Sequence, residues 1–103
     1  MTPEEVSSQV QTQIGADWDR TNAHGVDLRR CLVKPQKLTL ISAIDDKPAE
    51  AWVVLREDPH GGDGYAVVFD EISGEFGLAQ FAEGYEPCLL GWYGNFFEAL
   101  DAM

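Results

Sequence analysis

The chain has 103 residues, a formal net charge of −11 and 45% hydrophobic residues, with three Trp and five Phe. These values are typical of one folded domain, residues 1–103, and exclude an intrinsically disordered chain, which has few aromatic residues. Nucleic acids and anionic membranes attract cationic surfaces, so neither is an expected partner of so acidic a chain.

The charge is distributed unevenly along the chain. Residues 1–56 contain all seven Lys and Arg and eight Asp and Glu, which leaves a net charge of −1. Residues 57–103 contain ten Asp and Glu and no basic residue, a net charge of −10. We therefore expect the C-terminal half to present a strongly negative surface.

The N-terminus and the cysteines bear on the compartment. Glu4 and Glu5 stand where a secretory signal peptide carries basic residues before an apolar run. Cys31 and Cys88 are far apart, have no CxxC spacing and lie in apolar contexts, as buried free thiols do. The sequence predicts a cytoplasmic protein with two buried, unpaired cysteines.

The first predicted element is a helix that ends at Gly15. Thr2 and Glu5 form a Thr-x-x-Glu capping box, and Pro3 suits the first helical position. The apolar residues form one stripe at i+4 spacing: Val6, Val10 and Ile14. A helix with so narrow an apolar stripe must be stabilised by docking.

The segment NAHGVDLRRCLVKP predicts a loop followed by a short helical turn. Asp27 is placed to cap this turn, and Leu28, Cys31 and Leu32 share one face. Pro35 is expected to end it. A strand is the alternative, because the apolar residues of this segment also fit partial alternation.

Four or five strands are predicted next, with alternating apolar residues. They cover residues 36–44, 50–57, 65–71, 75–81 and 88–93. Trp52 and Val54 are expected to face one side of the second strand, and Val53 and Leu55 the other. Short connections between successive strands favour an antiparallel meander. Gly74, in the turn EISGE, is the candidate for a positive φ.

The last predicted element is a short helix after Gly94. Asn95 is a good cap, and Glu98 completes an Asn-x-x-Glu box. A core-facing stripe follows: Phe96, Phe97, Leu100 and Met103. An antiparallel sheet with the N-terminal and C-terminal helices on one face is an α+β two-layer sandwich, which is the predicted fold.

No motif of the sequence predicts a catalytic, cofactor or metal site. The segment HGGDG lacks the Lys and the following helix of a phosphate loop, and the chain has no GxSxG nucleophile motif. Asp58, His60 and Asp63 lie in one loop but lack the spacing of an EF-hand. This loop is interpreted as a hairpin connection, and His24 as a loop residue.

The favoured function is a small cytoplasmic interaction module that binds a basic protein through its acidic C-terminal half. Its site residues are predicted to be Trp18, Asp70, Glu71 and Glu75, since Trp is enriched at binding hot spots and dense charge steers association. An analogy with small acidic inhibitors and immunity proteins rests on size and charge alone.

Two other functions stay open from the sequence. A small-molecule-binding domain or enzyme would have a pocket between the sheet and its helices, lined by aromatic residues and closed by the His60 loop. Alternatively, the acidity serves solubility alone, and the protein is a monomer or pairs as a homodimer through an edge strand.

Overall fold

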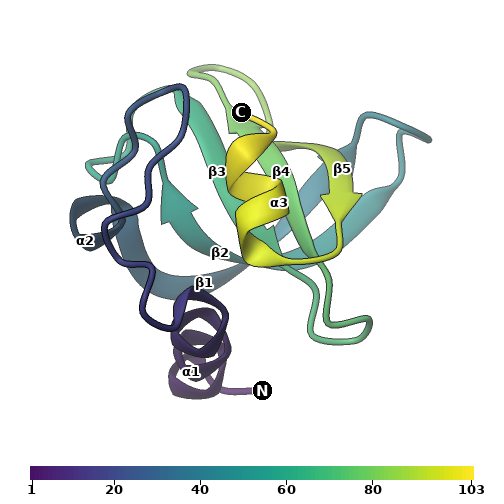
Figure 1. The fold of residues 1–103 in the computed structure, drawn as a ribbon. Helices are drawn as coiled ribbons and strands as arrows, with labels where there is room; N and C mark the ends of the chain where they lie inside the picture. The colour runs from purple at the N-terminus through teal and green to yellow at the C-terminus, as the bar shows by residue number, and fades with distance from the viewer.

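The computed structural model describes residues 1–103 and contains three helices and five strands (Figure 1). The helices are α1 (Pro3–Ile14), α2 (Leu28–Cys31) and α3 (Phe96–Asp101). The strands are β1 (Leu32–Ser42), β2 (Pro48–Arg56), β3 (Gly64–Phe69), β4 (Phe76–Phe81) and β5 (Cys88–Tyr93). These elements confirm the predicted α+β class, with one helix near the N-terminus and a short helix near the C-terminus.

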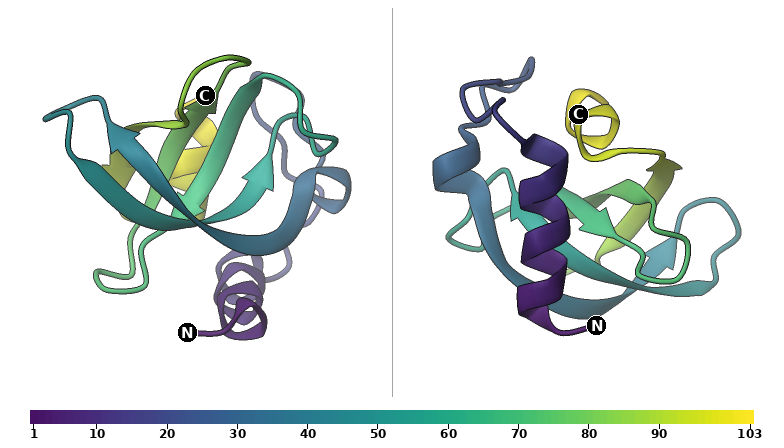
Figure 2. Two further views of the ribbon diagram at one scale, coloured as in Figure 1. Left: turned by 180° about the vertical axis from the view of Figure 1, so that it is seen from behind. Right: turned by 60° about the horizontal axis from the view of Figure 1, so that its bottom comes forward.

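The sheet closes into a barrel, so the predicted two-layer sandwich is wrong (Figures 1 and 2). Successive strands pair antiparallel, and β1 pairs with β5 in parallel through Ile41–Cys88 and Ser42–Leu89. In a five-stranded antiparallel meander the first and last strands run in the same direction. The twist of the sheet brings these two edges together, and the whole meander serves as the crossover connection.

The first strand begins earlier than predicted. The helical turn α2 is present with Asp27 as its cap, but it ends at Cys31, and β1 runs from Leu32 through Pro35 to Ser42. The register with β2 is irregular between Leu32 and Gln36. A proline fits a strand at such an irregularity because no ladder hydrogen bond needs its missing N–H.

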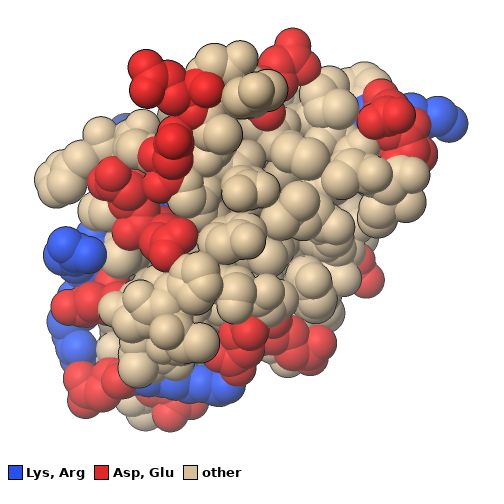
Figure 3. Space-filling view, turned by 90° about the horizontal axis from the view of Figure 1, so that it is seen from above, with Lys and Arg blue, Asp and Glu red and all other residues tan.

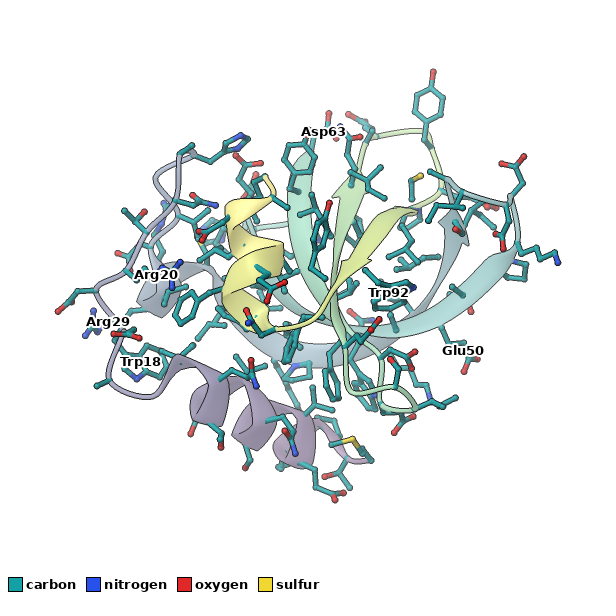
Figure 4. All side chains as sticks on the ribbon, turned by 45° about the vertical axis from the view of Figure 1, so that its right-hand side comes forward. Trp18, Arg20, Arg29, Glu50, Asp63 and Trp92 are labelled. Atoms are coloured by element: carbon teal, nitrogen blue, oxygen red, sulfur yellow. The ribbon has the colours of Figure 1, made fainter.

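Small and branched apolar side chains fill the interior of the barrel. They are Leu40, Ala51, Val53, Ala66, Val68, Ala79 and Leu89. Trp92 of β5 packs against this cluster and lies within the barrel in Figure 4. Three residues of this cluster are alanines on the neighbouring strands β2, β3 and β4. Their small side chains leave room for the walls of a five-stranded barrel to approach one another.

The helices pack on the outside of the barrel. The α1 residues Val6, Val10 and Ile14 are buried, and the predicted capping box of α1 is present. Asn95 caps α3 as predicted by accepting from the Glu98 N–H, but the Glu98 carboxylate accepts from the Asn95 side-chain amide instead of the Asn95 backbone N–H, so the second capping box is incomplete.

A cluster of 15 buried residues lies between the helices and the barrel, and we call it the outer cluster. The second strand departs from the prediction, because Leu55 belongs to this outer cluster together with Trp52 and Val54. A register shift between Val53 and Leu55 in the β2–β3 pairing accounts for this change of side.

Several local predictions are tested by the same structure. Gly74 has the predicted positive φ, at 76°. Both cysteines are unpaired, but only Cys31 is buried, since Cys88 is half-buried at the start of β5. Of the three helices, none has both the length and the apolar character needed to cross a membrane.

Candidate functional site

The three predicted site residues Asp70, Glu71 and Glu75 lie in or beside the β3–β4 turn, but they do not form a free acidic cluster. Both carboxylate oxygens of Asp70 act within the turn, where they accept hydrogen bonds from the Ile72 N–H and the Ser73 hydroxyl. Glu75 is exposed, and its carboxylate has no salt bridge. Asp70 therefore stabilises the turn, and Glu75 keeps an unpaired charge.

Glu71 is neutralised within the molecule. Its carboxylate lies 2.6 Å from the Lys37 ammonium and 2.7 Å from the N-terminal ammonium of Met1. The hydrogen bond from Lys37, followed by that from the N-terminus, lowers the pKa of Glu71 to about 2. Lys37 also lies 3.7 Å from Glu50, and its own pKa is raised, chiefly by the hydrogen bond to Glu71. This network ties the N-terminus and β1 to the β3–β4 turn.

Trp18, the fourth predicted site residue, is half-buried in the loop after α1. Its side chain packs against the outer cluster, and the Arg29 guanidinium lies 5.9 Å from the ring centroid (Figure 4). Arg29 also forms a 2.8 Å ion pair with Asp19. A surface groove of about 240 Å³ borders these residues, so part of the ring is accessible. Trp18 lies in the loop between α1 and α2, whereas the other three predicted site residues lie in or beside the β3–β4 turn.

The pocket expected between sheet and helices is occupied by side chains. The outer cluster fills the contact between the helices and the barrel. A surface hollow of about 270 Å³ borders α1 and β1, and its lining includes Val10, Leu32 and Pro35. His60 is exposed in the β2–β3 loop rather than placed over this contact.

Asp58 and Asp63, which were considered for a metal site, instead accept hydrogen bonds from backbone N–H groups in the loops. Asp58 Oδ1 accepts a hydrogen bond from the His60 N–H at 2.9 Å, and Asp63 Oδ1 accepts one from the Glu83 N–H at 2.7 Å. The structure gathers no group of three or more His, Cys, Asp or Glu side chains that could hold a metal ion. The Asp63–Glu83 bond joins the β2–β3 loop to the β4–β5 loop.

A groove of about 590 Å³ lies between these two joined loops. We call it the acidic groove. Its lining residues are Arg56, Gly61, Gly62, Asp63, Phe81, Ala82 and Glu83. Asp58 does not line the groove but lies next to the lining residue Gly62, since a Cβ placed on Gly62 would lie 2.0 Å from the Asp58 carboxylate. Two loops that are 20 residues apart thus bring Asp63 and Glu83 to one groove, with Asp58 adjacent to its lining.

The three carboxylates in and beside the acidic groove have no salt bridge. The one cation in its lining, Arg56, stacks on Phe81 with its guanidinium 4.2 Å from the ring centroid, and it donates to the Gly62 carbonyl. Figure 3 views the end of the molecule that carries the β4–β5 loop. Asp and Glu gather in several groups on this face, whereas Lys and Arg are confined to its periphery.

His24, for which the sequence indicated no partner, also forms side-chain contacts near this end of the barrel. His24 Nδ1 lies 2.6 Å from the Glu57 carboxylate, and the imidazole ring meets Tyr65 edge-on at 5.5 Å. The backbone N–H of Tyr65, and after it the hydrogen bond with His24, lower the pKa of Glu57. This contact fastens the loop between α1 and α2 to the start of the β2–β3 loop.

Sequence reasoning did not find the acidic groove, because its members come from two loops that the β3–β4 pairing and the Asp63–Glu83 hydrogen bond bring together, and the sequence indicates neither the register of that pairing nor the bond. The available signal was the pair of polar, glycine-containing connections DPHGGDG and EGYEP, which in a meander lie at the same end of the sheet. Comparisons of the chain with models of protein families, with curated proteins and with solved structures give no match.

Proposed function

We propose that this protein is an interaction module that binds a basic protein partner through the acidic groove. The observation that carries the proposal is that Asp63 and Glu83 line one groove, with Asp58 next to the lining residue Gly62, and that none of the three has an intramolecular salt bridge. A groove of about 590 Å³ has room for a Lys or Arg side chain of a partner. Unpaired carboxylates at its rim would then gain charge-assisted hydrogen bonds.

The field of the whole molecule supports the same partner. The chain carries a net charge of −11, and Asp and Glu outnumber Lys and Arg by 18 to 7. A single-sign field of this kind raises the association rate with a basic protein and disfavours acidic partners. Such steering decreases as salt screens the exposed charges.

An exposed aromatic residue lies in the same loop as Glu83. Tyr85, in the β4–β5 loop, is 81% exposed, although large hydrophobic residues are mostly buried in this fold. Tyrosines are enriched at protein interfaces because they add apolar area and a hydroxyl group at low entropic cost. Tyr85 is therefore the expected apolar anchor of the interface.

The test compares two variants with the same change in net charge. The first, Asp58→Asn, Asp63→Asn and Glu83→Gln, removes the charges of the acidic groove and keeps its side-chain oxygens as acceptors. The second, Asp45→Asn, Asp46→Asn and Glu75→Gln, removes three charges from the β1–β2 turn and from the β3–β4 turn region, none of which line the groove. The β3–β4 turn points away from the β4–β5 loop (Figure 1). Each protein, and the unchanged chain, is used to co-purify partners at low salt.

The association rate with the basic protein recovered is then measured at low and high ionic strength. We expect the groove variant to lower this rate about tenfold or more and the control variant to change it far less. Equal losses in both variants would show that net charge alone attracts the partner. A lower association rate in the control variant only would contradict the proposal and would favour an interface at the predicted Asp70–Glu75 turn.

A further inference from the structure

The mouth of the barrel contains a second hollow beside the acidic groove. Its volume is about 170 Å³. We call it the barrel-mouth hollow. Val33, Leu38, Val53 and Phe81 line it, and all four belong to or pack against the interior cluster of the barrel. The rest of its lining comes from Lys34, Gln36, Arg56 and Pro59. The hollow thus has an apolar wall and a cationic rim.

The two cations of this rim are unpaired. Unlike Arg20, Arg29 and Lys37, neither Lys34 nor Arg56 has a carboxylate within 4.0 Å. Arg56 uses one N–H to reach the Gly62 carbonyl at 3.0 Å. A guanidinium group has five N–H donors, so most of those on Arg56 are free for a ligand.

The position of Arg56 is set before any ligand arrives. Its guanidinium lies over Phe81, with its central carbon 4.2 Å from the ring centroid, and one of its N–H groups donates to the Gly62 carbonyl. Phe81 is in turn packed against the interior cluster. A cation held by two contacts loses less conformational entropy on binding an anion than a mobile side chain does.

We propose that the barrel-mouth hollow binds a small organic monocarboxylate whose apolar body is an aromatic ring or a short aliphatic chain. The carboxylate would accept hydrogen bonds from Arg56 and Lys34, and the apolar body would contact Val33, Leu38 and Val53. The size fits, because an apolar cavity of about 150 Å³ takes up benzene in another protein. Barrel mouths are also a common location for small-molecule sites.

The charge of the ligand follows from the same surroundings. The apolar wall offers no partner for a charged group that lies away from the rim, so a ligand charged at both ends would leave one charge unpaired in the hollow. The net charge of −11 further opposes the approach of a multiply charged anion. A monoanion experiences the least repulsion and can still pair with the two local cations.

An NMR titration with three ring compounds of similar size tests this inference. Benzoate is the proposed ligand class, benzyl alcohol is its neutral counterpart, and benzylamine is the cationic one. We expect benzoate to shift the methyl signals of Val33, Leu38 and Val53 with a Kd below about 1 mM. Benzyl alcohol should bind about tenfold or more weakly, since it loses the charged hydrogen bonds. Benzylamine should not shift these signals.

Single substitutions separate the rim cations from the overall charge. Lys34→Gln changes an exposed side chain and should weaken benzoate binding about three- to tenfold, and Arg56→Gln should weaken it more. The control is Lys47→Gln, because Lys47 is exposed and unpaired but lies in the β1–β2 turn. The triple variant of the acidic groove keeps both rim cations and should still bind benzoate, so failure of one proposal is distinguishable from failure of the other.

Three results would overturn the inference. These are the absence of methyl shifts with benzoate at about 10 mM, equal affinity for benzoate and benzyl alcohol, and an equal loss of affinity in Lys47→Gln and Lys34→Gln. If Arg56→Gln does not fold, as its methyl spectrum would reveal, the comparison of Lys34→Gln with Lys47→Gln decides the question.

Discussion

Gly77 in β4 lies directly opposite Trp92 in β5, and the indole ring occupies the space that a side chain on residue 77 would need. A Cβ placed on Gly77 would lie 2.7 Å from Trp92 Cε3 and 2.7 Å from the Gly91 carbonyl oxygen. Trp92 in turn packs against the interior cluster of the barrel. The absence of a side chain in one strand thus lets the largest side chain of the next strand lie inside a small barrel.

Replacement of Gly77 by alanine should therefore destabilise the protein. The new methyl group must displace either the backbone of Gly91 or the ring of Trp92, and overpacking of this kind costs about 1–3 kcal/mol. Urea denaturation measures the loss. The matched control is Gly84→Ala, where a Cβ meets nothing within 4 Å and only the positive φ of 81° opposes the change. A Gly77→Ala protein as stable as the unchanged chain would show that the strands separate freely here.

The two neighbouring phenylalanines of α3 should differ in their contribution to stability. Phe96 is fully buried and meets Phe76 edge-on, with ring centroids 5.7 Å apart. Phe97 is half-buried and stacks under the Arg20 guanidinium. Phe96→Ala should lower the free energy of unfolding by about 3–5 kcal/mol, and Phe97→Ala by about half as much. Equal losses would contradict the burial difference.

Glu71 should make stability depend on pH in the acidic range. Its pKa is lowered from 4.5 to about 2 by Lys37 and the N-terminus. A carboxyl group with a lowered folded-state pKa stabilises the protein above its unfolded pKa, and this contribution disappears as the pH falls through the folded pKa. Thermal melting between pH 6 and pH 2 (the range set by that pKa) should show Glu71→Gln less stable at pH 6 and nearly equal to the unchanged protein at pH 2.

The control for this experiment is Glu75→Gln. Glu75 lies in the same turn region but has no salt bridge, so its substitution should leave the pH profile unchanged or raise stability slightly by reducing charge repulsion. Parallel profiles for Glu71→Gln and the unchanged protein over the whole range would show that the ion pairs of Glu71 do not stabilise the fold.

Gly74 is required by its backbone conformation rather than by crowding. Its φ is 76°, and a Cβ at this position would meet nothing within 4 Å. Gly74→Ala should therefore cost about 1 kcal/mol through strain alone. Gly74→Asn should cost less, because asparagine tolerates a positive φ better than other residues do. Chemical denaturation of the two variants checks the order, and a smaller loss for alanine would contradict it.

Local features of this protein could be predicted from the sequence because they depend on residues a few positions apart. The capping box Thr2–Glu5 and the Asn95 cap of α3 are present as the sequence predicts, and Gly74 has its predicted positive φ. The last strand, Cys88–Tyr93, also has its predicted bounds. For the caps and for Gly74 the physical cause, a side chain near an unsatisfied N–H or the missing Cβ of glycine, lies within the segment itself.

The closure of the barrel and the composition of both candidate sites were decided only by the tertiary structure. Alternation shows that a strand has two apolar sides, but it does not distinguish a flat sheet from one whose first and last edges meet at Ile41 and Cys88. The acidic groove depends on the β3–β4 pairing, which brings its two loops together beside the Asp63–Glu83 bond, and the neutralisation of Glu71 depends on Lys37, which is 34 residues away. A carboxylate's charge follows from its residue type, whereas the cation or loop that it faces follows from how the twisted strands bring distant segments together.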